Sequence, residues 1–135
     1  MPFDVKNLHP PARFYWDEAK TEWIEVRTMT GKALIDLRKS TTTKKVDYWR
    51  PEKSTEKPFR YEYTEMNDEL FNELFWDHQI VNWNFTDPEG VAIPCTKENK
   101  ILLLGNSNEF ATWVMGNLTQ LDADEKKRAE KSEKN

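Results

Sequence analysis

The chain has 135 residues, of which 37% are hydrophobic, 33% are charged and six are tryptophan. This size and composition are typical of one domain with a compact core and additional solvated chain. The longest apolar run, Ile101–Leu104, is far shorter than the roughly 20 residues of a membrane span, and Met1–Lys6 lacks the features of a secretion signal. The net charge of −4 argues against nucleic-acid binding, because phosphate neutralisation requires basic residues. With a single cysteine, Cys95, these features predict a protein of a reducing, cytoplasmic compartment.

The N-terminal part contains two short runs with the composition of strands. Residues 13–16 and 22–27 are rich in aromatic and β-branched side chains, and the five polar residues between them suit a hairpin connection. Residues 1–12 show no periodicity and are interpreted as a leader. Residues 28–40 follow with threonines at their start and apolar residues at helical spacing, which predicts a helix.

A second hairpin is predicted in the middle of the chain. Residues 46–49 and 59–63 have strand composition, and the polar segment Pro51–Pro58 between them is interpreted as a mobile connector. The later run shows the clearest alternation in the chain, because its aromatic residues recur with a period of two. These residues are Phe59, Tyr61 and Tyr63.

The aromatic residues of the predicted strands have two interpretations. They could stack on nucleic-acid bases, as aromatic side chains of RNA-binding sheets do, or they could fill the core on one face and form an amphipathic surface on the other. We favour the packing interpretation. The aromatic residues concerned are Trp16, Trp23, Tyr48, Trp49, Tyr61 and Tyr63, and the basic residues near them are Lys44, Lys45, Arg50, Lys53, Lys57 and Arg60.

The C-terminal half predicts three helices, a strand and a turn. Asn67 precedes two acids and an apolar series, as expected at a helix start. Residues 81–85 alternate as a strand, and residues 87–90 have the proline and glycine of a type I turn. Thr96 can cap a helix that ends near Leu104, and a last helix begins at about residue 108.

These elements predict an α+β fold, with a small antiparallel sheet of hairpins near the N-terminus packed against three or four helices. The single domain is expected to span residues 13–121. Beyond it, residues 122–135 contain five acids and five bases and no apolar side chain larger than alanine. This charged tail is expected to be disordered or a frayed helix.

The residues that could carry catalysis are few and separated. His9 and His78 stand 69 positions apart, and Cys95 is the one thiol; a Cys95–His78 pair is the catalytic alternative to structural roles for all three. This set has no zinc-binding spacing, and the four glycines are too scattered to form a phosphate-binding loop. We therefore expect a protein that is not an enzyme and uses no metal or cofactor.

The order of motifs in the C-terminal third, more than any one of them, is similar to a known family. An apolar-Val-x-Trp stretch is followed by an Asp-x-x-Gly turn, a bridge containing proline, a Thr-x-Glu-Asn helix start and a charged end. In this sequence they are Ile80–Trp83, Asp87–Gly90, Val91–Cys95, Thr96–Asn99 and residues 122–135, after an N-terminal hairpin that contains Trp23–Arg27. The chain thereby resembles the tail assembly chaperones of long-tailed bacteriophages over residues 13–40 and 70–135.

This resemblance implies a helper protein of the host cytoplasm that is absent from the finished virion. Family members bind the tape measure protein, a long helical chain, and help to bring tail tube proteins to it. The oligomeric state stays open, and a homo-oligomer is compatible with this role. Two alternatives remain: a small phage nucleic-acid-binding or regulatory protein that uses residues 44–63, and a structural connector of the tail.

The apolar stripe of the last helix is the candidate partner-binding surface. It consists of five residues at helical spacing. We expect Phe110 and Val114 to lie in the core, and Leu118 and Leu121, which are nearer the charged end, to be available to a client. Trp113 could serve either purpose and completes the candidate set.

Overall fold

The structure of the protein is a computed structural model that describes residues 10–50, 52 and 57–133, with side chains described as far as residue 130. Two separate antiparallel sheets and four helices make up this part of the chain, which confirms the predicted α+β class. In chain order the elements are β1 (Ala12–Tyr15), β2 (Trp23–Val26), α1 (Gly31–Thr41), β3 (Thr42–Trp49), β4 (Phe59–Met66), α2 (Asp68–Gln79), β5 (Ile80–Trp83), α3 (Lys97–Asn106) and α4 (Asn108–Glu133).

The first sheet has three antiparallel strands in the order β1-β2-β5. The predicted N-terminal hairpin is confirmed, with Ala12 opposite Val26 and Tyr15 opposite Trp23. Its turn is held by Asp17, whose carboxylate accepts hydrogen bonds from the backbone N–H groups of Thr21 and Glu22. Ala12, which was predicted to belong to the leader, is the first residue of β1 and packs against the core; residues 1–9 lie outside the described part.

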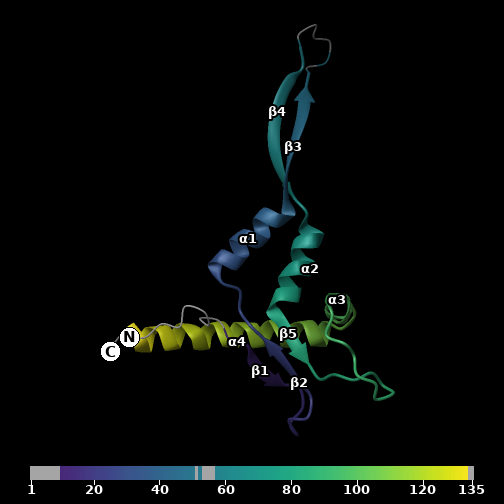
Figure 1. The fold of residues 1–135 in the computed structure, drawn as a ribbon, viewed down its shortest axis with the longest axis vertical. Coiled ribbons are helices and arrows are strands. Elements are labelled where there is room, and N and C mark those ends of the chain that lie inside the picture. The colour runs from purple at the N-terminus through teal and green to yellow at the C-terminus, as the bar shows by residue number, and fades with distance from the viewer. Residues whose placement is uncertain (1–9, 51, 53–56, 134–135) are drawn as a thin grey trace.

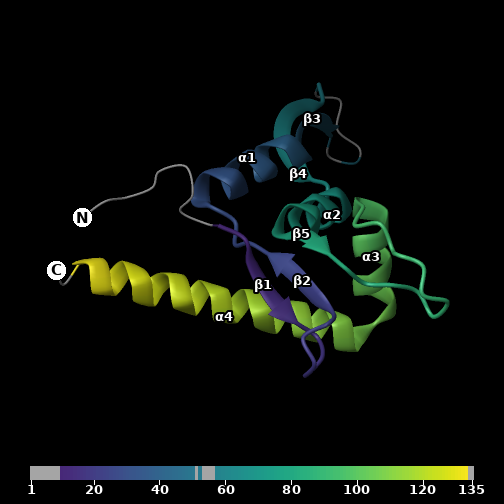
Figure 2. The same ribbon diagram turned by 60° about the horizontal axis from the view of Figure 1, so that its bottom comes forward.

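The core lies between this sheet and α4. Alternate residues of β2 are buried, as the period of two requires, and they meet buried residues of β5 and α4. Figure 2 shows α4 running across the three-stranded sheet. The buried hydrophobic residues of this core are Ile24, Val26, Ile80, Trp83, Phe110, Val114 and Leu121.

The helix that supplies this core extends well beyond it. Phe110 and Val114 are buried, as predicted, and α4 continues through the predicted tail to Glu133. Thr28, a buried residue after β2, donates a hydrogen bond of 2.8 Å from Oγ1 to Glu125. Contact between α4 and the rest of the domain therefore reaches past Leu121.

Side-chain caps begin the four helices at or near the predicted positions. Asn67 and Thr96 accept hydrogen bonds from backbone N–H groups of α2 and α3, as predicted. Of the two threonines predicted as caps of the first helix, Thr28 and Thr30, it is Thr30 that caps α1, and the helix runs from Gly31 to Thr41. Ser107 ends α3 through its own N–H and accepts at Oγ from Phe110 at the start of α4, which turns the chain sharply between the two helices.

Candidate partner-binding surface

The second hairpin projects from the domain as an arm, a name we use here for β3 and β4 (Figure 1). The strands pair in register from Thr42 opposite Met66 to Trp49 opposite Phe59. All eight residues of each strand are exposed. Most of the connector Pro51–Pro58 lies outside the described residues. The arm is therefore a two-stranded ribbon with solvent on both faces.

Two helix ends hold the arm at its base. β3 follows α1 without an intervening residue, and one residue, Asn67, separates β4 from α2. The N–H of Asn67 donates to the carbonyl of Thr41 at 2.8 Å, and the buried Thr41 hydroxyl donates to the carbonyl of Leu37 at 2.9 Å. An isolated two-stranded hairpin is only marginally stable in water. These contacts attach the base of the arm to the rest of the domain and thereby support it.

One face of the arm carries four of its five aromatic residues. Residues directly opposite in an antiparallel pair share a face, and successive residues alternate between faces. Applied to the register of β3 and β4, this puts four aromatic side chains on one face, named here the aromatic face: Trp49, Phe59, Tyr61 and Tyr63. Phe59 is 71% exposed and Trp49 59%. The rings of Tyr61 and Tyr63 lie 5.9 Å apart between centroids.

The packing interpretation of these aromatic residues is therefore wrong for the arm. We expected the inward members to fill the core, but Tyr48, Trp49, Tyr61 and Tyr63 are all exposed. Alternation of apolar and polar residues with a period of two indicates that one face of a strand is apolar. It does not report whether a second layer covers that face, and none does among the described elements.

The charges of the arm balance one another. Its strands contain three basic and three acidic residues, and the basic ones are paired: Lys44 with Glu62 at 3.0 Å, Lys45 with Glu65, and Arg60 with Glu62 at 3.3 Å. The hydrogen bond that Lys45 donates to the Glu65 carboxylate raises the pKa of Lys45. A surface that binds phosphates needs an excess of free cations, so this charge pattern suits a protein partner better than a nucleic acid.

The structure does not bring the three predicted binding residues of α4 to one surface. Trp113 is half-buried and stands edge-on to Trp16, with ring centroids 4.8 Å apart. Leu118 is half-buried and lines a separate groove with Gln79. Leu121 is 4% exposed and belongs to the core, so it is not available to a client in this structure.

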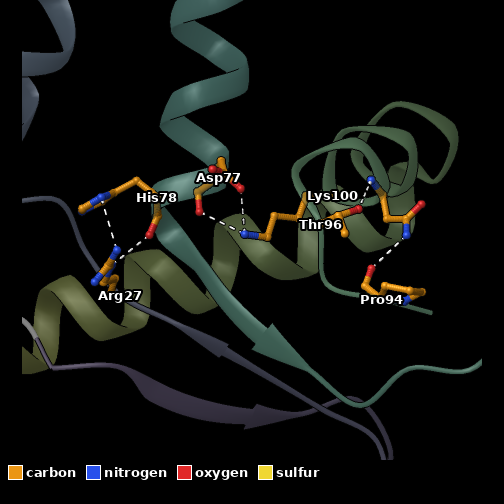
Figure 3. Close-up of polar contacts among 7 residues, drawn as sticks. Arg27, Asp77, His78, Pro94, Thr96 and Lys100 are labelled. Atoms are coloured by element: carbon orange, nitrogen blue, oxygen red, sulfur yellow. Dashed lines mark hydrogen bonds and ion pairs between the residues drawn. The ribbon is translucent and has the colours of Figure 1, made fainter. Parts of the chain in front are cut away.

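Of the candidate catalytic residues, His78 belongs to a polar network at the C-terminal end of α2 (Figure 3). Lys100 has a side chain 7% exposed, and its Nζ donates to the backbone carbonyl of Asp77 at 3.1 Å and to its carboxylate at 2.9 Å. Arg27 Nε donates to the carbonyl of His78 at 2.9 Å. Both cations thus satisfy carbonyls at a helix C-terminus, where positive charge is favoured.

Burial favours the neutral forms of His78 and Cys95. Burial, and then the positive charge of Arg27, lowers the pKa of His78. Arg27 Nη2 lies 3.4 Å from Nδ1 of His78, and because a guanidinium can only donate, that nitrogen is the acceptor. Burial also raises the pKa of the Cys95 thiol, which reduces its reactivity. His9 lies outside the described residues, within which no group of side chains with metal-ligand character occurs.

No protein-family model, curated protein or solved structure matches this chain. Within the described residues, no helix is long and apolar enough to cross a lipid bilayer.

Proposed function

We propose that this protein is a non-catalytic tail assembly chaperone of a long-tailed bacteriophage. In this role it binds the tape measure protein in the host cytoplasm, helps to recruit tail tube subunits and is absent from the finished virion. The order of motifs in residues 70–135 supports the family. The aromatic face of the arm is the observation that carries the binding role.

The arm suits an elongated helical client for three reasons. Eight-residue strands extend about 27 Å, a length over which an amphipathic helix makes about five turns. Exposed aromatic side chains recur along one face of β4 from Phe59 to Tyr63, and large exposed apolar patches mark interaction sites. The ion pair of Lys45 with Glu65, on the same face nearer the base, adds a polar border, as in helix-in-groove recognition.

The same residues support the two alternative functions less well. A nucleic-acid-binding role would use the arm, but its strands carry no net charge and their basic residues are paired. A connector of the tail would also bind proteins through the arm. It differs from a chaperone in staying in the particle, so mass spectrometry of purified virions separates the two roles.

The experiment that tests the proposal is co-expression with the tape measure protein of the same genome, followed by solubility and pull-down assays. The wild type should keep the tape measure protein soluble and co-purify with it. The double variant Tyr61→Ser, Tyr63→Ser should lose both effects, because it removes the middle of the aromatic face. Deleting residues 108–121 is unsuitable, since it would remove Phe110, Val114 and Leu121 from the core.

A matched control changes the opposite face of the same arm. Tyr48 is exposed on β3 and pairs across the strands with Arg60, so Tyr48→Ser alters the arm without touching the aromatic face. This variant should bind as the wild type does. If the tape measure protein is insoluble with every variant, wild type included, the chaperone proposal is refuted; equal loss in both variants refutes the aromatic face as the binding surface.

A further inference from the structure

A small apolar cleft lies between the end of β1 and the start of α4, two elements that lie far from the arm in Figure 1. It is formed by the residue after β1, the segment between β5 and α3, and the junction of α3 with α4, and its volume is about 230 Å³. An apolar cavity of about 150 Å³ can hold benzene, so the cleft has room for one aromatic ring. It is lined by Trp16, Glu22, Phe85, Thr86, Ile93, Leu103, Ser107 and Phe110.

Closely packed aromatic side chains form the wall of this cleft. Phe85 and Phe110 meet nearly at right angles, with ring centroids 6.0 Å apart, and Trp16 stands edge-on to Trp113 on the other side. Both arrangements are favourable for aromatic pairs, and each leaves ring edges or faces for a further ring. An entering aromatic side chain would thus meet the geometry that aromatic clusters prefer.

The rim of the cleft is acidic. Glu22 lines it directly, and Glu109 lines the neighbouring hollow that shares Trp16. The two turns on either side, residues 17–22 and 86–90, together contain five acids and one lysine. A ligand for this cleft should therefore combine an aromatic ring with positive charge.

The tip of the arm has that combination. Phe59 is the most exposed of the large hydrophobic residues in the described chain, and Trp49 lies directly opposite it on the same face. Arg50 and Lys57 lie within two residues of the pair in sequence and are exposed, against one acid, Glu52, among the described residues between Trp49 and Phe59. In Figure 1 the arm extends away from β1 and α4, next to which the cleft lies.

We propose that the chain self-associates head to tail, with Phe59 of one molecule entering the cleft beside Trp16 of a second copy. The basic tip then lies on the acidic rim. The interface is heterologous, because each molecule contributes its tip to one neighbour and its cleft to another, so association continues into open chains or closes into a ring. A second copy fits better than a helical client, since a helix needs an extended groove rather than a cleft for one ring.

Two single variants test this interface with the purified protein alone. Phe59→Ser removes the entering ring at an exposed position. Thr86→Arg places a long cationic side chain at the exposed rim of the cleft, where it blocks entry and repels the basic tip. Each should weaken self-association at least about tenfold, as expected for the central residue of a small interface. Tyr48→Ser, on the other face of the arm, is the control and should associate as the wild type does.

The decisive measurement is sedimentation velocity over about 10 µM to 1 mM, the range of a weak, small interface. The wild type should form species larger than dimers as its concentration rises. Phe59→Ser retains a cleft and Thr86→Arg retains a tip, so each alone should stay monomeric, while an equimolar mixture should form one heterodimer and nothing larger. Circular dichroism checks that both variants are folded.

Three outcomes would overturn the inference. The wild type could remain a monomer throughout, Phe59→Ser could associate as strongly as the wild type, or the mixture could fail to form a heterodimer. The last result would indicate a symmetric contact between identical surfaces. None of these measurements involves the tape measure protein, so a negative result would not refute the chaperone proposal.

Discussion

Replacing Leu121 by alanine should destabilise the domain strongly, although this residue lies at the border of the charged C-terminal segment. Its side chain is 4% exposed within the core. The substitution removes the equivalent of about three methylene groups, each worth about 0.8 kcal/mol of burial, which amounts to about 2.4 kcal/mol. A cavity adds to this loss, so we expect a decrease of about 3–4 kcal/mol in the free energy of unfolding, within the range of buried leucine-to-alanine changes.

The matched control is Leu102→Ala, which makes the same chemical change on α3. Leu102 is 57% exposed, so its replacement should change the free energy of unfolding by less than about 1 kcal/mol. Urea unfolding followed by tryptophan fluorescence measures both, because Trp83 is buried next to the core residues of α4. Equal losses in the two variants, or a loss below about 1 kcal/mol for Leu121→Ala, would refute the position of α4 beyond Val114.

Three further predictions concern the network at the end of α2 and the start of α3. The lowered pKa of His78 means that the fold favours the neutral ring; its contribution is complete above the ordinary pKa of 6.5 and is lost as the pH falls through the lowered value. The urea midpoint of the wild type should therefore drop more than that of His78→Gln between about pH 7.5 and 5.5, and parallel curves would contradict this. Lys100→Met should cost about 1–3 kcal/mol in urea unfolding, because Asp77 loses its cation and a carbonyl its donor; an unchanged midpoint would exclude a stabilising role. Thr96→Ala should cost about 1 kcal/mol by the same assay through loss of the cap of α3, and no loss would mean that Thr96 does not cap α3 in solution.

Local signals account for the elements that could be predicted from the sequence. Asn67 and Thr96 were identified as helix starts because a side-chain oxygen must satisfy the free N–H groups there, and both caps are present. The N-terminal hairpin followed from strand composition on either side of a short polar turn. Each of these features is decided within a few residues, which is why sequence alone identifies them.

Burial is decided by distant parts of the chain and was predicted less well. The arm has the alternation of a half-buried strand, but no described element covers its aromatic face. Leu121 was expected to be available because the residues after it are charged. Its spacing of seven residues from Val114, two turns of the same helix, was the signal that it continues the buried stripe. The cleft beside Trp16 joins the loop after β1, the segment between β5 and α3, and residues of α3 and α4, and no single stretch of sequence indicates it.

The two proposed uses of the arm can be separated because they involve different parts of the aromatic face. Tyr61 and Tyr63 lie in the middle of the arm, whereas Phe59 is the first residue of β4, at its tip. Since all three are exposed, replacing them removes no core contact, and the free energy of unfolding should change by less than about 0.5 kcal/mol. Phe59→Ser should therefore lose self-association and keep most of its binding to the tape measure protein, because Tyr61 and Tyr63 remain, whereas Tyr61→Ser with Tyr63→Ser should lose client binding and keep self-association. If both variants lost both activities, the client would be bound only by the associated form, and the arm would act through assembly rather than as an independent binding surface.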